Sequence, residues 1–374
     1  MKNEMKRENR NESVRLSLRD GVERLAVRLL MNLPGPVQIL LSGRKAVVHE
    51  NNTLSPQLQL MLAMRARRKR KPLSEISLEQ ARRGLLRDSQ VHAARPIAVG
   101  AVSDLQIPAA HGLITARHYS PAAAAGSGPV PLLVFFHGGG FALCDLETHD
   151  APCRYLCQRM GMQILSVDYR LAPEFPFPAA LEDAFTSWVW AEKNAMKLGV
   201  DPERISIGGD SAGANLAAVV CQLAAAEAQK LPLAQLLFYP VTDRTRHYAS
   251  MDHFAEGFFL TRADIEYFKE LYAPEAKVPD FRLFPLIAKS LSGQPPAVVV
   301  TAGFDPLRDE GEAFAEALGR AGVRTDLLRL PSMIHGFMNF MEISSECRDA
   351  MAKSADHFTA LCTALGASNR SSNA

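Results

Sequence analysis

The stretch Ile205-Ser206-Ile207-Gly208-Gly209-Asp210-Ser211-Ala212-Gly213 joins a short apolar run to an alanine-rich segment that continues to Ala228. The apolar run predicts a buried strand, and the alanine-rich segment predicts a helix. Ser211 lies at the junction in the pattern Gly-x-Ser-x-Gly, which is typical of a sharp strand-to-helix turn that exposes a nucleophilic serine. Glycine at 209 and 213 permits close approach of the helix to the strand. We therefore expect Ser211 to be a nucleophile presented at this corner.

Strand and helix signals alternate on both sides of the corner. Apolar runs predict strands at residues 131–136, 163–168, 204–208, 234–239, 297–302 and 325–330. Helical patterns predict helices near residues 151–160, 178–197, 212–228, 309–321 and 346–365. Because these strands are continuously apolar, they indicate a mostly parallel central sheet with helices on both faces. Residues 102–107 and 113–119 predict an antiparallel pair at its edge. The fold class is therefore α/β.

Two segments lie outside this alternation. Residues 1–95 predict an N-terminal helical region, with helices near 14–30, 55–68 and 77–87. An insertion at about 241–290, with a helix at 261–272, separates two predicted strands at the edge where α/β proteins bind ligands. We therefore expect a helical cap from residues 1–95, helped by the insertion, on a catalytic domain of residues 96–374.

The composition is typical of a globular protein, but the charge is unevenly distributed. The 374 residues are 47% apolar and 22% charged. Residues 1–100 hold 20 Lys and Arg against 9 Asp and Glu, and the remainder holds 22 against 31. The basic run at 65–71 contains no aromatic residue, so we interpret it as a solvated helix end and expect no nucleic-acid partner.

Cysteine usage and the absence of a long apolar segment bear on location. The six cysteines show no regular metal-binding spacing, which favours buried thiols in a reducing compartment. The charged segment at residues 1–8 lacks the apolar core of a signal peptide, and no stretch is long enough to span a bilayer. We expect a cytoplasmic protein with no membrane span.

A glycine-rich loop follows the strand at 131–136 directly. Its sequence is His137-Gly138-Gly139-Gly140, and a turn of this kind lets backbone N–H groups approach a developing oxyanion. We expect the amides of Gly138, Gly139 and Ala212 to be the donors. His137 is expected to hold the loop in shape, with Gly140 as a further supporting residue. Asp210, beside the nucleophile, is expected to support the pocket wall or a hydrogen-bond network.

The chain order after Ser211 supplies an acid and a base. Asp305 follows the apolar strand at 297–302, and His335 follows the strand at 325–330, which is the order Ser, Asp, His of the α/β-hydrolase triad. Asp309 is the competing acid, but it lies at the start of the next helix and is expected to cap it. The competing histidine, His357, falls inside the predicted C-terminal helix.

These motifs together resemble those of the bacterial hormone-sensitive-lipase family of α/β-hydrolase esterases. The similarity spans about residues 100–365, and the matching residues are His137–Gly140, Asp168–Glu174, Gly209–Gly213, Asp305–Asp309 and His335–Phe337. The resemblance implies carboxylester hydrolysis by Ser211, Asp305 and His335, with a cap over the site. It also implies short- to medium-chain acyl esters. Residues 168–174 are expected to brace the oxyanion loop through ion pairs.

The expected reaction is two-step acyl transfer on a small-molecule ester, which needs no metal and no cofactor. An amidase or deacetylase on the same triad stays open, because the motifs define acyl transfer and not the leaving group. A non-catalytic ligand-binding protein on the same fold is the alternative of another class. A homodimer is one possible assembly.

Overall fold

The strand that precedes the serine corner, β7 (Val200–Asp210), lies inside an eight-stranded sheet. The computed structural model describes residues 17–68, 71–93, 95–122, 128–275 and 279–372. The sheet order is β10-β9-β8-β7-β5-β6-β4-β3. Pairing is parallel from β10 to β6, whereas β4 pairs antiparallel with β6 and with β3. The predicted α/β sheet with an antiparallel edge is therefore confirmed.

The elements follow one another in alternation, as the sequence indicates. The other strands are β1 (Val48–His49), β2 (Asn52–Thr53), β3 (Ala101–Ala109), β4 (Gly112–Ser120), β5 (Val130–Phe136), β6 (Gln163–Asp168), β8 (Gln235–Phe238), β9 (Ala297–Phe304) and β10 (Thr325–Ile334). The helices are α2 (Leu18–Met31), α3 (Gly35–Ser42), α4 (Pro56–Arg67), α5 (Leu78–His92), α6 (Asp150–Met160), α7 (Ala179–Asn194), α8 (Ala212–Ala226), α9 (Ala249–His253), α10 (Arg262–Tyr272), α11 (Arg308–Arg320) and α12 (Ser345–Ser372).

Alternating side chains of the strands build a separate core on each face of the sheet. In β5, Leu132, Val134 and Phe136 enter the core under α7, α8 and α11, while Leu133 and Phe135 enter the core under α6 and α12. Burial of an apolar side chain of this size contributes about 1.5–3 kcal/mol. The sheet is thus fixed on both faces, and its strand ends can hold side chains rigidly.

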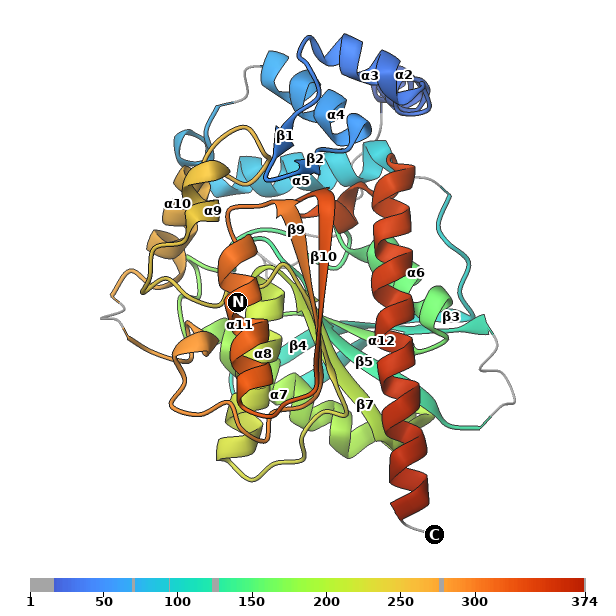
Figure 1. The fold of residues 1–374 in the computed structure, drawn as a ribbon. Helices are drawn as coiled ribbons and strands as arrows, with labels where there is room; N and C mark the ends of the chain where they lie inside the picture. Colours follow the sequence, from blue (N-terminus) through green and yellow to red (C-terminus); the bar gives the residue numbers. More distant parts are fainter. Residues whose placement is uncertain (1–16, 69–70, 94, 123–127, 276–278, 373–374) are drawn as a thin grey trace.

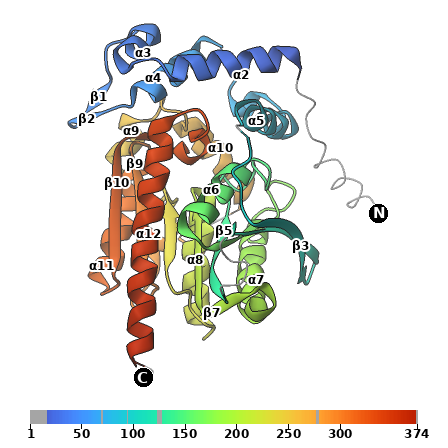
Figure 2. The same ribbon diagram turned by 90° about the vertical axis from the view of Figure 1, so that its right-hand side faces the viewer.

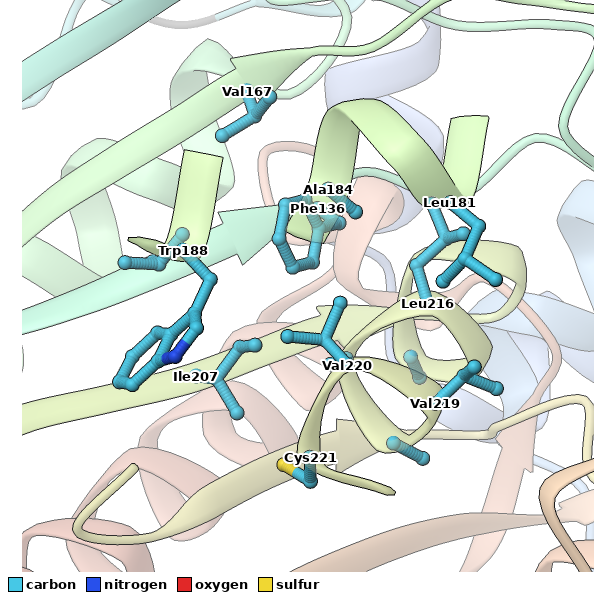
Figure 3. Packing of buried hydrophobic residues seen from close by; sticks show 14 of the residues in the cluster. Phe136, Val167, Leu181, Ala184, Trp188, Ile207, Leu216, Val219, Val220 and Cys221 are labelled. Atoms are coloured by element: carbon cyan, nitrogen blue, oxygen red, sulfur yellow. The ribbon is translucent and has the colours of Figure 1, made fainter. Parts of the chain in front are cut away.

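The first core surrounds the helix that follows the serine corner. Figure 3 shows Trp188 of α7 and Val220 of α8 beside Ile207 of β7. All three are fully or almost fully buried. The indole N–H of Trp188 donates to the carbonyl of Lys230, so its one polar atom has a partner inside this core.

The N-terminal helices and the insertion gather at one end of the molecule. Figures 1 and 2 show α2 to α5 together with α9 and α10 beyond the ends of β9 and β10, whereas the C-terminus lies at the opposite end. Phe304 and Ile334 are the last residues of β9 and β10. The helical elements therefore lie over the carboxyl edge of the sheet, where α/β proteins hold ligands.

Some of the elements predicted for the cap segments differ from those in the structure. Pro34-Gly35-Pro36 ends α2 as expected, but α3 begins at once, because proline is compatible with the first turn of a helix. The β1–β2 hairpin and α9 have no counterpart among the predicted elements. Val14 and Leu16 of the first predicted helix, and residues 69–70 of the basic run, lie outside the described residues.

Two further observations concern the cysteines and the length of the helices. All six cysteines are free, and five of them are buried. Within the described residues, no single helix is long and apolar enough to cross a membrane. Helices α2 and α3 reach that length and apolar character only together, and the chain bends by 119° between them.

Candidate active site

Ser211 occupies the corner between β7 and α8 in a conformation that L-residues rarely adopt. Its φ and ψ are 54° and −116°, and its backbone N–H donates to the carbonyl of Phe238 at 2.9 Å. The neighbouring glycines are required by contact, because a Cβ at Gly213 would meet the Phe136 carbonyl oxygen at 1.9 Å. A Cβ at Gly209 would meet that oxygen at 2.5 Å. The Gly-x-Ser-x-Gly pattern is thus explained by the packing of α8 against β5.

A continuous chain of hydrogen bonds joins the three predicted triad residues. His335 Nε2 lies 2.9 Å from Ser211 Oγ, and His335 Nδ1 lies 2.8 Å from Asp305 Oδ2. Asp305 is fully buried, and its Oδ1 accepts the backbone N–H of Leu307 at 2.8 Å. The side chains come from the ends of β7, β9 and β10. The geometry suits proton transfer from Ser211 to His335, with Asp305 fixing the orientation of the ring.

The competing acid and the competing histidine lie elsewhere. Asp309 is in the first turn of α11, but it does not cap its own helix as expected: its Oδ2 accepts the N–H of Ser250 at 2.8 Å. Its Oδ1 accepts from Arg308 Nε at 2.8 Å. His357 is inside α12 as predicted. The carboxylate that reaches His335 is therefore Asp305.

The glycine loop after β5 turns sharply in front of Ser211. Gly139 and Gly140 have φ of 107° and 60°, which only glycine adopts without strain. His137 is fully buried, its Nδ1 lies 2.8 Å from the Gly138 carbonyl oxygen, and its ring stacks on Tyr169. Burial, with repulsion from His149, lowers the pKa of His137 to about 4. His137 is thus a neutral residue in contact with the backbone of the loop.

One predicted oxyanion donor is not available. The Gly138 N–H donates to Asp210 Oδ1 at 2.7 Å, so it is already bonded within the protein. A Cβ at Gly138 would meet Asp210 Oδ2 at 2.4 Å, which shows how closely the carboxylate covers this residue. The expectation for Gly138 is therefore wrong: a buried aspartate beside the nucleophile needs donors, and this amide is one of them. Among the described residues, the amides of Gly139, Gly140 and Ala212 donate to no protein acceptor.

Asp210 is the centre of a buried polar network, as the sequence suggested for this residue. Besides the hydrogen bond from the Gly138 N–H, Asp210 accepts one from the Tyr239 hydroxyl at 3.4 Å. His149 Nε2 lies 3.1 Å from Asp210 Oδ1. Burial opposes ionisation of Asp210, but the attraction of His149 and the donated hydrogen bonds outweigh it and lower its pKa. The network therefore ties the loop and the nucleophile corner together. His149 carried no sequence signal, because it belongs to no recognised motif.

Helix α5 of the N-terminal region is bonded to the glycine loop. Arg82 Nε donates to the Ala142 carbonyl at 2.8 Å, and its Nη2 donates to the Ala172 carbonyl at 2.9 Å. The same guanidinium pairs with Glu174 at 2.7 Å. The Ala172 N–H in turn donates to the Phe141 carbonyl at 2.8 Å. The segment 168–174 thus contacts the loop through a backbone hydrogen bond, and the ion pair of Glu174 joins the segment to Arg82 of α5.

Helix α10 of the insertion covers the same loop from another side. Phe268 packs so closely that a Cβ at Gly140 would lie 2.3 Å from its ring. The rings of Phe141 and Tyr272 stack with centroids 3.8 Å apart. These contacts place the insertion over the nucleophile corner, and they connect the end of the sheet with the helical elements above it.

A large, mostly apolar cavity opens between these parts. Its volume is 1490 Å³, and Ser211, His335, Gly139 and Gly140 line its inner end. Toward the N-terminal helices, its wall is made by apolar side chains of α2, α4 and α5, together with Phe259, Leu260 and Ile265 of the insertion. Apolar cavities with a few polar groups at one end are typical of small-molecule sites.

Three arginines of the basic run make contacts within the protein, and Arg65 and Arg68 also line the cavity. Arg65 lies over the Phe259 ring at 5.0 Å, Arg67 donates to the Leu41 carbonyl at 2.9 Å, and Arg68 pairs with Glu23 at 2.8 Å. Helix α4 ends at Arg67, where cations are favoured by the helix dipole. The three arginines are exposed at a helix end, as predicted, but they also contact other parts of the protein.

The loop after β8, which forms part of the cavity wall, is held by hydrogen bonds to a buried glutamate. Glu310 of α11 is 1% exposed, and its Oε1 accepts the N–H groups of Thr242 at 2.8 Å and Asp243 at 3.4 Å. Arg244 Nε is 3.8 Å from the other oxygen. Burial raises the pKa of Glu310 to about 7, although Arg244 and the two amides lower it and so offset part of the effect of burial.

We expect the stability of the protein to fall as pH rises through 7 because of Glu310. The folded pKa of about 7 lies above the ordinary value of 4.5, so the contribution is complete below pH 4.5 and is lost as pH rises to 7. The loss amounts to about 3 kcal/mol. Urea unfolding of the wild type and Glu310→Gln at pH 5 and pH 8 measures it, with the exposed Glu316→Gln on the same helix as control. Equal pH dependence of wild type and Glu310→Gln would contradict the assignment.

Comparisons with known proteins agree with this geometry. A family model described as the alpha/beta hydrolase fold matches residues 133–339. Carboxylic ester hydrolase LipN of Mycobacterium tuberculosis is 46% identical over 341 residues, which cover 86% of this chain and 87% of that protein. Ethyl acetate hydrolase of Pseudomonas putida is 34% identical over 80% of this chain and 96% of that protein.

A solved structure supports the same grouping. An ester hydrolase from the metagenome of Lake Arreo, complexed with a bipyridine phosphonate derivative, matches with a TM-score of 0.79 and 38% identity. The match covers 84% of this chain and 99% of that one. The chain therefore belongs to the hormone-sensitive-lipase-like carboxylesterase family of the α/β-hydrolase fold.

Proposed function

We propose that Ser211, His335 and Asp305 hydrolyse carboxylic esters through an acyl-enzyme. The observation that carries this proposal is the hydrogen-bond chain from Ser211 Oγ through His335 to Asp305, with contacts of 2.9 and 2.8 Å. Ser211 Oγ attacks the ester carbonyl carbon while His335 Nε2 takes its proton. His335 then gives this proton to the departing alcohol. A water molecule activated by His335 releases the acid and regenerates Ser211.

The negative charge on the carbonyl oxygen requires donors that are free in the resting enzyme. We assign this role to the amides of Gly139, Gly140 and Ala212, in place of the Gly138 amide that Asp210 already occupies. Such donors act only when the charge develops, and loss of one typically lowers kcat by about 10²–10³. Asp210, by fixing Gly138, is a positioning residue for this loop.

The geometry supports acyl transfer, and the names of the relatives favour an ester substrate, whose leaving group is an alcohol. Similar proteins carry the names carboxylic ester hydrolase and ethyl acetate hydrolase. The test compares kcat/KM for p-nitrophenyl acetate and p-nitroacetanilide, which share the acyl group. A preference for the ester is expected, and a preference for the anilide would favour the amidase alternative. Fluorophosphonate labelling of Ser211 tests the non-catalytic alternative, which predicts no label.

The cap assignment follows from contacts with the glycine loop. We propose that residues 1–95 and the insertion at 241–290 together form the cap of a catalytic domain of residues 96–374. Arg82 of α5 binds the Ala142 carbonyl, Phe268 of α10 packs on Gly140, and Arg65 of α4 lies over Phe259 of the insertion. These contacts support a cap in which both segments act as one cover over the site.

The substrate that the cavity favours is an ester with an apolar acyl chain. We propose short- to medium-chain esters, because a volume of 1490 Å³ holds such a chain together with the alcohol part. The cytoplasm stays the proposed location, supported by six free cysteines. A homodimer stays a proposal as well, and light scattering of the purified protein tests it.

Filling the cavity from α5 is expected to shift the chain-length preference toward short esters. Gly84 lines the cavity, and a Cβ built on it meets no atom within 4 Å, so Gly84→Phe adds a ring to open space. We expect kcat/KM for the longest accepted p-nitrophenyl ester to fall at least about tenfold relative to the acetate, because each methylene in an apolar pocket is worth roughly 1–3 kcal/mol. Gly84→Ala is the matched control. An unchanged profile for Gly84→Phe would place the acyl chain elsewhere.

A further inference from the structure

Three side chains with metal-ligating atoms meet outside the catalytic centre, where the β1–β2 hairpin contacts α9. His49 ends β1, Glu50 follows in the hairpin turn, and His253 is the last residue of α9. Their ligand atoms all lie within 4.8 Å of one another. Across the described ranges, no other set of three or more His, Cys, Asp or Glu side chains meets this condition. We propose that His49, Glu50 and His253 form a binding site for a divalent transition-metal cation of the zinc type.

The distances among the ligand atoms fit one face of a small tetrahedron. His49 Nε2 is 3.0 Å from His253 Nδ1 and 3.6 Å from Glu50 Oε1, and His253 Nδ1 is 3.9 Å from Glu50 Oε1. Zinc–ligand bonds of about 2.0–2.1 Å in tetrahedral geometry place neighbouring ligand atoms roughly 3.3–3.4 Å apart. The three distances bracket this value, so adjustments of a few tenths of an ångström bring all three atoms to one cation. Water completes the fourth position.

The ligand types select the class of cation. Two imidazole nitrogens and one carboxylate oxygen suit zinc and related transition metals, whereas magnesium and calcium prefer oxygen ligands throughout. The three side chains are partly exposed, at 32%, 45% and 38%, so a cation can reach them from solvent. None of the three lines the catalytic cavity. The proposed ester chemistry therefore does not depend on this site.

The carboxylate ligand is already oriented by a buried neighbour. Arg308 Nη1 pairs with Glu50 Oε2 at 2.9 Å, which leaves Oε1 directed to the two histidines. Arg308 is 4% exposed, its own charge is balanced by Asp309 at 2.8 Å, and its guanidinium lies over the Phe254 ring at 5.3 Å. An ion pair of this kind holds the second oxygen of a ligating carboxylate, and loss of such a partner weakens metal binding.

Phe254, which lies under the Arg308 guanidinium, also contacts the rings of His49 and His253. The His49 and Phe254 rings make an edge contact with centroids 5.1 Å apart, and Phe254 is 1% exposed. Glu50 and Asn51 form the hairpin turn with positive φ values of 47° and 64°. A glutamate in this conformation is uncommon, since glycine, asparagine and aspartate usually occupy it. The turn therefore presents its carboxylate toward α9 at a conformational cost.

A cation here connects three parts of the chain. The hairpin belongs to the N-terminal region, and α9 belongs to the insertion. Arg308, which holds Glu50, donates through Nη1 to the Gly303 carbonyl at 3.2 Å, and its backbone N–H donates to the Asp305 carbonyl at 3.1 Å. Metal binding therefore joins both proposed cap segments to the loop that carries Asp305. The expected consequence is a more stable attachment of the cap.

Calorimetric titration of the untagged, chelator-treated full chain with zinc chloride tests the site. We expect one zinc ion per chain, and at least about tenfold weaker binding after His253→Ala or Glu50→Gln, in line with the loss of one of three ligands. Zinc at about one hundred times the wild-type Kd should raise the Tm of the wild type by about 3–4 °C and that of His253→Ala by no more than about half as much. Glu50→Gln retains the shape of the side chain, so it is informative even if His253→Ala unfolds.

The matched control is His247→Ala. His247 precedes α9, is 72% exposed and pairs with Asp252 at 2.8 Å, so it represents a surface histidine near the site. We expect His247→Ala to bind zinc as the wild type does. The proposal is overturned if the wild type binds no zinc, if His253→Ala and Glu50→Gln bind it unchanged, or if His247→Ala loses it. In those cases the contact between His49 and His253 is an N–H···N hydrogen bond alone. Ester hydrolysis is measured separately, because a failed zinc site leaves the triad assignment untouched.

Discussion

Ser211→Ala is expected to lower kcat for p-nitrophenyl acetate by about 10⁴-fold or more and to leave the fold intact. His335 Nε2, now 2.9 Å from the Ser211 hydroxyl, would face a methyl group, and no acyl-enzyme could form. Serine and alanine both carry a Cβ, so the uncommon φ of 54° costs the variant no more than it costs the wild type. Steady-state kinetics measure the loss, and circular dichroism checks the fold.

The matched control for this prediction is Ser206→Ala. Ser206 lies on the same strand, is 1% exposed and has Cys362 Sγ at 3.7 Å from its hydroxyl, so the substitution removes a buried hydroxyl away from the triad. Activity within about tenfold of the wild type is expected. Near-normal turnover by Ser211→Ala, or fluorophosphonate labelling of that variant, would show that another residue is the nucleophile.

The sheet was predictable because its strands are local apolar runs with helices between them. Each predicted strand of the parallel part, such as residues 163–168, has a counterpart in β5 to β10. The serine corner was predictable for a related reason, since a Cβ at Gly213 has no room beside Phe136. The positions of Ser211, Asp305 and His335 at the strand ends could therefore be predicted from local sequence.

Contacts between distant segments were less accessible from sequence. The sequence predicts an oxyanion role for the Gly138 amide because it does not reveal which donor the Asp210 carboxylate binds. In the structure, this amide donates to Asp210 Oδ1 at 2.7 Å. Arg82 and Phe268 reach the same loop from segments about sixty residues before it and more than one hundred and twenty residues after it, with no shared motif. The β1–β2 hairpin was missed because each of its strands has two residues, too few for a periodic pattern.

Asp305→Asn is expected to lower kcat by about 10⁴-fold through the tautomer of His335. Asp305 Oδ1 accepts the Leu307 N–H at 2.8 Å, and this bond should hold the oxygen of the asparagine amide. The NH₂ group then faces His335 Nδ1, where Asp305 Oδ2 now lies at 2.8 Å. Because an NH₂ group donates, Nδ1 must accept, and the ring proton moves to Nε2. His335 in that form cannot take the proton of Ser211.

Asp309→Asn is the control that separates the effect on the His335 tautomer from the effect of losing a negative charge near the site. Asp309 accepts from the Ser250 N–H and from Arg308, and asparagine can satisfy one of these donors with its oxygen while making no contact with His335. We expect activity within about tenfold of the wild type and a small loss of stability in urea unfolding. If Asp309→Asn lost as much activity as Asp305→Asn, the acid would act through the field of both carboxylates. A loss confined to Asp305→Asn, with unchanged circular dichroism, means that catalysis depends on the tautomer of one ring.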